Sequence, residues 1–323
     1  MSGPAHFPAL EQVRLAPGPV HLAIGMFDGV HRGHQAVVGA AIRAAHAAGG
    51  RAGVLTFSPH PSVVLRPERP TPLILPPALK LGLLARLGVD FVVEHPFTAE
   101  FAATSAEGFV ARLRAAFPGL EAVYAGENFR FGRGREGDVA FLRSAAAAAG
   151  FAVHGAPRLG HGDAPISSSR VRELLAAGDV AGANALLGYT YFAEGVVRPG
   201  KRLGRTLGFP TLNVPWSSGL RPRLGVYAAV VAGPDGRRQP AVANYGLRPT
   251  VEAGATEPRL EVHVLEATAL TEGDRLRVWW LDFLRPEQRF AGLGELRAQV
   301  ERDRVEAALR LARARLQEFP NST

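Results

Sequence analysis

Residues 20–48 read VHLAIGMFDGVHRGHQAVVGAAIRAAHAA, and the architecture of the first half of the chain follows from them. The segment begins with a short apolar run, passes through a glycine-rich turn at 25–35 and ends in an alanine-rich helical pattern. Glycine is unfavourable inside regular structure, so its clustering indicates a backbone that must come close to another group. The segment therefore predicts a strand, a turn that binds something, and a helix.

Strand-like and helical patterns alternate through the rest of the first half. Further strands are predicted at 52–57, 90–95, 121–126 and 151–156, and helices at 77–88, 104–117 and 138–150. We expect a capping box at the start of the second of these helices, with Thr104 as N-cap and Glu107 three residues on. This alternation predicts a parallel, doubly wound sheet, in which ligands bind beyond the carboxyl ends of the strands.

The second half consists of short β-like runs without intervening helices. They lie at 188–199, 209–214, 225–232, 239–246, 259–267 and 274–285, with a GPDG turn at 233–236 between two of them. The pattern predicts an antiparallel β-barrel or sandwich. From about residue 292 the chain predicts one long helix, and we expect its apolar side to pack on the barrel through Val305, Ala308, Leu309, Ala312 and Leu316. The predicted domains are 1–186 and 187–323.

Composition sets outer limits on function. The 323 residues exceed one typical domain, and the absence of cysteine excludes disulfides and thiolate metal sites. A net charge of +8 favours anionic partners, but only two of the 37 basic residues are lysine and the arginines are scattered among glutamates. The charge therefore does not predict a nucleic-acid partner. No signal-peptide pattern and no run of about 18 apolar residues is present, so we expect a soluble cytoplasmic protein without membrane contact.

His31 and His34 lie three residues apart in the turn, where the first helix is expected to begin. A helix N-terminus presents free backbone N–H groups to an anion, and two imidazoles add side-chain donors beside them. Such a site suits a phosphate chain on which charge develops as pyrophosphate leaves. Two other interpretations stay open at this stage: an incidental structural pair, and a zinc site, although HRGH does not match HExxH.

A second segment, ISSSRVRELL at 166–175, offers N-cap hydroxyls before a helix that carries Arg170 and Arg172 in its first turn. Alone, it also describes a capped surface helix with solvated arginines. In chain order, however, GMFDGVHRGH, TFSPHP, GENFRFG and ISSSRVR resemble the adenylyltransferase half of the bacterial bifunctional riboflavin kinases/FAD synthetases. HRGH also matches the HxGH signature of the wider nucleotidyltransferase superfamily.

This resemblance implies a Rossmann-like nucleotidyltransferase domain that transfers the adenylyl group of ATP to FMN and releases pyrophosphate. Matched residues would line the ATP site (Gly25, Phe27, Asp28, His31, Gly33 and His34), close it from the other side (Ser168 and Arg170) and place the FMN or adenylate portion (Asn128). His31, His34 and Arg170 would be its catalytic residues. Ser58 stands where the family often has an acidic residue, which leaves open how Mg²⁺ is placed in this half.

Residues 200–214, GKRLGRTLGFPTLNV, form a glycine-rich and basic segment that runs into a strand. They fit no Walker motif, and composition alone also describes a flexible loop. Together with GVYA (225–228), NYGLRPT (244–250) and LEVHVLE (260–266), they resemble the riboflavin kinase module and its GFPTxN signature.

Spacing favours a magnesium-nucleotide site in this half. Thr211 and Asn213 lie two apart, so on a strand they face one side, and hydroxyl and amide oxygens suit Mg²⁺ bound with nucleotide phosphates. Glu261 alternates with Val262 and Val264, so its carboxylate faces away from the valines, whether as a functional group or as an exposed strand residue.

The resemblance assigns further roles in the kinase half. It implies that Glu261 is the catalytic base toward the ribityl 5′-hydroxyl of riboflavin. Gly208, Thr211 and Asn213 would bind the nucleotide, and Lys201 would face phosphate from a loop over ATP. Val251 replaces an aromatic residue of the family's NxGxxPTF motif.

The sequence thus predicts a bifunctional enzyme that makes FMN from riboflavin and ATP in the barrel, and FAD from FMN and ATP in the α/β half, with Mg²⁺. Ser58 and Val251 keep open an enzyme in which only one half is active. The alternative of another class is a non-catalytic flavin sensor or RNA-binding protein, against which stands the lack of a basic, aromatic stripe. No oligomeric state is predicted.

Overall fold

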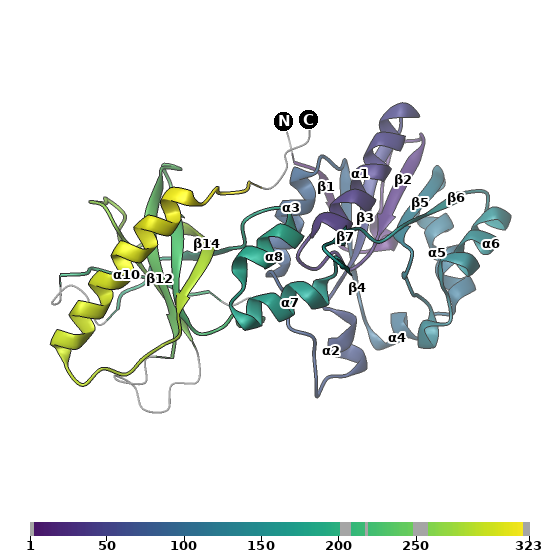
Figure 1. The fold of residues 1–323 in the computed structure, drawn as a ribbon. Helices are drawn as coiled ribbons and strands as arrows, with labels where there is room; N and C mark the ends of the chain where they lie inside the picture. The colour runs from purple at the N-terminus through teal and green to yellow at the C-terminus, as the bar shows by residue number, and fades with distance from the viewer. Residues whose placement is uncertain (1–2, 201–207, 217–218, 248–257, 319–323) are drawn as a thin grey trace. The chain divides into compact units, whose positions relative to one another are not determined.

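The computed structural model describes residues 3–200, 208–216, 219–247 and 258–318. They form two compact units, the first ending at Ser168 and the second spanning Ser169–Glu318 (Figure 1). Helices α7 (Ser168–Ala177) and α8 (Val180–Leu187) pack mainly with the second unit, where the Asn184 side chain donates to the Trp280 carbonyl at 3.0 Å. The functional division at residues 186 and 187 stays a prediction.

A six-stranded parallel sheet organises the first unit. Its strands are β1 (Ala5–Phe7), β2 (Val20–Ile24), β3 (Arg51–Ser58), β4 (Phe91–Pro96), β5 (Leu120–Gly126) and β6 (Ala152–Ala156). Their order is β1-β4-β3-β2-β5-β6, so the chain winds in one direction from β2 and in the other from β5. The predicted doubly wound sheet is confirmed, and its switch point lies between the carboxyl ends of β2 and β5.

Sequence patterns missed the shortest strands of this unit. Edge strand β1 and the two-residue strands β7 (Gly160–His161) and β8 (Ala164–Pro165) are too short for any periodicity to show. The five longer strands were all predicted, to within a residue or two at each end.

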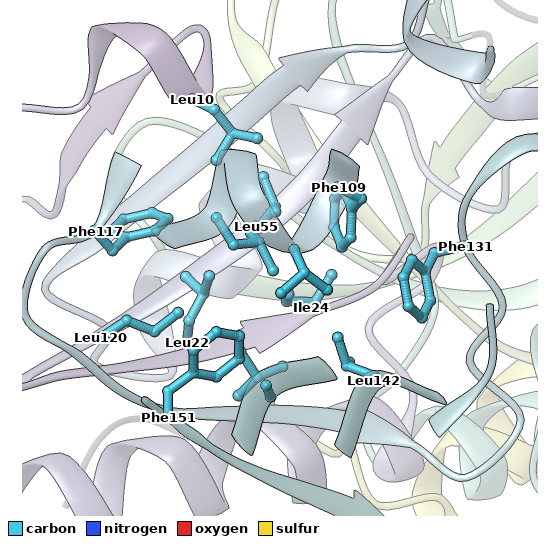
Figure 2. Close-up of a cluster of buried hydrophobic side chains, with 14 of the residues drawn as sticks. Leu10, Leu22, Ile24, Leu55, Phe109, Phe117, Leu120, Phe131, Leu142 and Phe151 are labelled. Carbon is cyan, nitrogen blue, oxygen red and sulfur yellow. The ribbon is translucent and has the colours of Figure 1, made fainter. Parts of the chain in front are cut away.

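One hydrophobic cluster of the first unit lies on the face of the sheet where alternate residues of β2 meet two helices. Leu22 and Ile24 point into a cluster that includes residues of α5 (Ala106–Ala116) and α6 (Val139–Ala149). Figure 2 shows Ile24 among Phe109, Phe131 and Leu142. Helix α1 (Arg32–Ala47) packs on β2, β3 and β5. The remaining helices are α2 (Pro61–Leu65), α3 (Pro77–Arg86), α4 (Ala99–Ala102) and the 3₁₀ turns Leu10–Gln12 and Arg133–Arg135.

The predicted capping box at Thr104 is wrong by one residue. Helix α5 begins at Ala106, and its N-cap is Ser105, whose hydroxyl accepts from Gly108 N at 3.1 Å. The Thr104 carbonyl instead accepts from Arg133 N at 2.8 Å. Both residues can cap, and this tertiary contact decides which of them does.

The second unit is a nearly closed antiparallel barrel. Its strands are β9 (Phe192–Val196), β10 (Leu212–Val214), β11 (Gly225–Ala232), β12 (Arg238–Gly246), β13 (Arg259–Val264) and β14 (Arg275–Arg285). They follow the order β10-β13-β12-β11-β14-β9, and Arg198 N closes the ring by donating to the Asn213 carbonyl at 2.9 Å. The predicted barrel and its turn at 233–236 are confirmed, with Gly236 at φ +72°.

Helix α10 (Leu293–Arg313) lies along the barrel, as predicted, but not through the predicted side (Figure 1). Val305 and Leu309 are 55% and 54% exposed, and Ala308 and Ala312 are exposed as well. Leu316 lies beyond the end of the helix. The buried side instead carries Asp303 and Ala307, because an ion pair to the barrel fixes the rotation of the helix.

Helix length and apolarity bear on any membrane role. Among the residues that the structure describes, none of the helices is both long and apolar enough to span a membrane.

Candidate active sites

The turn after β2 has an unusual backbone. Phe27, Gly29 and Val30 all have positive φ, at +50°, +77° and +39°. Two of these are not glycine, and Val30 is β-branched, so the turn is held in a strained form by its surroundings. Such strain is typical of functional turns, and it lies at the switch point where a ligand is expected.

The two histidines of the turn lie face to face. His31 is the N-cap of α1, and its Nδ1 accepts from His34 N at 3.3 Å. The imidazole rings stack with centroids 3.5 Å apart and planes 16° apart, and the Phe27 ring meets His34 edge-on at 5.4 Å. A Cβ at Gly33 would lie 3.2 Å from the His31 ring, so glycine leaves room for the stack. The structure thus brings four predicted residues together.

Asp28 connects this turn to the loop that contains Ile74. It is only 3% exposed, and its two carboxylate oxygens accept from Ile74 N at 3.0 and 3.2 Å. A Cβ at Gly29 would lie 2.8 Å from the Ile74 side chain, so the loop at 74 rests directly on the turn. The Ser168 hydroxyl donates to the Asp28 carbonyl at 2.9 Å. Two predicted residues, Asp28 and Ser168, therefore hold the turn in place.

An aromatic cavity of about 550 Å³ lies in the same unit. It is lined by Met26, Phe57, Phe97, Phe101, Phe109, Asn128, Phe129 and Phe131, with Leu65, Arg66, Arg130 and Arg135 also on its wall. The rings of Phe129 and Phe131 stack 5.5 Å apart with planes 14° apart. Asn128 was predicted, but the phenylalanines were not selected, although Phe57, Phe129 and Phe131 lie in the TFSPHP and GENFRFG motifs. Phe97, Phe101 and Phe109 come from other segments that only the sheet topology joins to them.

The other residues singled out for the first site lie on separate elements. Gly25 follows β2, and a Cβ there would lie 3.2 Å from the Phe27 ring. Ser58 ends β3 in register with Pro96. Arg170 lies in α7, within the second compact unit.

In the second unit, register places the predicted polar residues side by side. Glu261 of β13 pairs directly with Asn213 of β10 on one side and with Asn244 of β12 on the other. Directly paired residues have Cβ atoms about 4.5–5.5 Å apart, so the three side chains form one row on the same face. Leu260 and Val262 are buried on the other face, which confirms that Glu261 points away from the barrel interior.

His263 holds the segment that leads into β10, at Phe209 and Pro210. Its Nδ1 donates to the Pro210 carbonyl at 2.9 Å, and its ring meets Phe209 edge-on at 5.6 Å. Burial lowers the pKa of His263, which favours the neutral ring. His263 was not among the predicted site residues, although it lies two positions after Glu261 on the same face.

A groove of about 530 Å³ runs between the start of this segment and α10. It is lined by Gly208, Phe209, Gly294, Arg297, Ala298, Glu301 and Arg304. Thr211 and Asn213, further along the same segment, are half-buried, and a Cβ at Gly200 would collide with the Asn213 amide at 2.1 Å. Lys201 and Val251 lie outside the described residues. Among the residues described, no cluster of three His, Asp or Glu side chains could hold a metal by itself.

These features are typical of enzymes that bind nucleotides. The first unit has the switch-point helix N-terminus of nucleotide-binding enzymes, and the second has a carboxylate beside amide groups on a barrel. Two family models divide the chain: FAD synthetase matches residues 15–170 and riboflavin kinase matches residues 187–311. The chain belongs to the family of bifunctional riboflavin kinases/FMN adenylyltransferases.

Individual relatives agree over most of the chain. The Escherichia coli K12 bifunctional riboflavin kinase/FMN adenylyltransferase is 39% identical across 88% of this chain and 91% of its own length. The Bacillus subtilis protein of the same name is 37% identical across 88% and 90%. A crystal structure from Streptococcus pneumoniae, described as a macrolide-efflux protein, superposes with a TM-score of 0.84 at 28% identity and covers 94% of this chain and 98% of its own.

Proposed function

We propose that the two units carry two consecutive reactions of flavin cofactor synthesis, one site each. In the barrel, riboflavin and ATP give FMN and ADP. In the α/β unit, FMN and a second ATP give FAD and pyrophosphate. Family membership supports both activities. The observation that carries the assignment of sites is the stacked His31–His34 pair at the start of α1, in the unit that also holds the aromatic cavity.

In the adenylyl transfer, an FMN phosphate oxygen attacks the α-phosphorus of ATP, and the bond to the β-phosphate breaks. The FMN phosphate is already ionised, so no base is required and positioning dominates catalysis. We assign His31 and His34 as donors to the triphosphate, together with the first N–H groups of α1, because charge grows on the leaving pyrophosphate. Ser168 and Arg170 are assigned to close the site.

The aromatic cavity is suited to the flavin ring of FMN. Its phenylalanines offer apolar surface and ring faces to a flat tricyclic ligand, and Asn128 offers an amide that can hydrogen-bond its polar edge. Arg66, Arg130 and Arg135 add positive charge at the wall, which suits a ligand that carries phosphate.

In the kinase site, the nucleophile is an alcohol and therefore needs a base. We assign this role to Glu261: its carboxylate takes the proton of the ribityl 5′-hydroxyl as that oxygen attacks the γ-phosphorus of ATP and ADP leaves. The adjacent Asn213 and Asn244 keep the carboxylate in a polar row. The groove beside Phe209 and α10 provides room for substrate, and the Phe209 ring contacts His263, two residues after Glu261.

The donor set of this second site fits Mg²⁺ carried in by ATP. Thr211 and Asn213 would hold the ion with one hydroxyl and one amide oxygen, and the nucleotide phosphates would supply most other ligands. The close approach of Gly200 to the Asn213 amide leaves the segment no room for a larger side chain. Bound there, the ion would neutralise charge on the transferring phosphates. A cytoplasmic location and the absence of a nucleic-acid partner remain predictions of the sequence.

Separation of the two activities tests the site assignments. We expect His31→Ala with His34→Ala to abolish FAD formation from FMN while riboflavin phosphorylation stays near the wild-type rate. Glu261→Gln should do the reverse when FMN is supplied. The spared reaction shows that its own unit is folded, and far-UV circular dichroism against the wild-type chain shows whether the unit that carries the substitution is folded. Loss of both activities in either variant, or of neither, would contradict the assignment.

A further inference from the structure

Lys80 is a buried ammonium group for which the reaction described above has no use. It lies in α3 and is only 7% exposed, although lysine is almost never buried without partners. Removing such a charge from water is strongly unfavourable, so its surroundings must compensate. Lys80 is also one of only two lysines in the whole chain.

The partners of Lys80 lie at the carboxyl ends of β3 and β4. Its Nζ donates to the Thr56 hydroxyl at 3.1 Å and to the Phe57 carbonyl at 3.4 Å, and the Glu94 carboxylate is 3.8 Å away. Burial lowers the pKa of Lys80, while the charges of Glu94 and Asp28 oppose this effect. Both carboxylates thus favour the ammonium form.

The Thr56 hydroxyl connects Lys80 to the strained turn. An ammonium group can only donate hydrogen bonds, so the Thr56 oxygen must accept from it and turn its own proton elsewhere. That proton goes to the Met26 carbonyl, 3.1 Å away. Met26 directly precedes Phe27, the first residue of the turn with positive φ. The direction of donation therefore runs from Lys80 through Thr56 to the turn.

We propose that Lys80 is a positioning residue for adenylyl transfer, which acts through Thr56 and Met26 to hold the turn that presents Phe27 and His31. This inference rests on the proposed function of the first unit. Lys80 need not touch the nucleotide. Without it, the Thr56 hydroxyl can rotate, and one of the contacts that keep the turn in its strained form is weakened.

The test combines three single variants and one double variant. Lys80→Met removes the ammonium at similar length, Thr56→Val removes the hydroxyl at similar shape, and Thr56→Ser is the matched control that keeps it. We expect kcat/KM for ATP in FAD formation to fall about 10-fold or more in the first two variants and to stay within about 2-fold in Thr56→Ser. The double variant should be no worse than the poorer single one, because both changes break the same path.

Riboflavin phosphorylation is assigned to the second unit and should not change, while far-UV circular dichroism and the melting temperature of each variant show whether the first unit is folded. Unchanged kcat/KM for ATP in Lys80→Met and Thr56→Val, with only a lower melting temperature, would overturn the proposal in favour of a purely stabilising lysine. Independent, multiplying losses in the double variant would overturn it too. If Lys80→Met fails to fold, Thr56→Val against Thr56→Ser still decides. Failure of the wild-type chain to form FAD would instead count against the proposed function.

Discussion

A buried ion pair between Asp303 and Arg285 joins α10 to the barrel, and Asp303→Ala should show how much it contributes to stability. The Asp303 carboxylate accepts from Arg285 at 2.7, 2.9 and 3.1 Å and from Gln299 at 2.9 Å, and its side chain is only 6% exposed. Removing one partner of a buried pair costs about 3–5 kcal/mol. Arg285 keeps a bond to the Pro286 carbonyl at 3.0 Å, so we expect the lower end, about 3 kcal/mol.

Urea unfolding followed by tryptophan fluorescence measures this loss in the second unit alone, because all three tryptophans, at 216, 279 and 280, lie there. With an m-value of about 1–3 kcal/mol per molar urea, the midpoint should fall by about 1–3 M. Val305→Ala, on the exposed side of α10, is the control and should change stability by less than about 0.5 kcal/mol. A loss under about 1 kcal/mol for Asp303→Ala, or a larger loss for Val305→Ala, would refute the reasoning.

Two further predictions concern the first unit. Phe129→Ala removes one ring of the Phe129–Phe131 stack and should raise KM for FMN about 5- to 30-fold with KM for ATP unchanged. An unaltered KM for FMN in steady-state assays would contradict the assignment of the flavin ring to this cavity. Burial lowers the pKa of His95, whose Nδ1 accepts from Leu10 N at 3.2 Å, so the unfolded chain takes up the proton first. The stability of the first unit should therefore fall as pH drops below about 6.5. This loss is measured as a decrease in the temperature at which half of the FAD-forming activity is lost. The decrease should be smaller in His95→Asn, and an equal decrease in this variant would contradict the role of His95.

Much of the fold follows from local patterns. The β2–α1 segment and the longer strands were predictable because each has its own periodicity and turn residues, and the spacing around Glu261 correctly gave the face on which it lies. The packing side of α10 was predicted wrongly because apolar spacing ignores charge. In this arginine-rich helix, the partner of Asp303 is Arg285, eighteen residues earlier in the chain.

The site was predictable where one segment carries it and not where several segments converge. His31, Gly33 and His34 lie within four residues, and their chemistry is visible in the motif. The aromatic cavity joins segments as far apart as Phe57 and Phe131, so only topology reveals it. Lys80 carried one signal, its rarity in the composition, but nothing in its neighbourhood indicated burial against Thr56.

The most direct test of the two-reaction account is a time course of the wild-type chain with riboflavin, excess ATP and Mg²⁺, with flavins and phosphate products separated by chromatography. The account predicts that FMN rises first and then gives way to FAD, with one ADP released for each riboflavin consumed and one pyrophosphate for each FAD formed. No conversion of riboflavin, or FAD appearing without equimolar pyrophosphate, would contradict it.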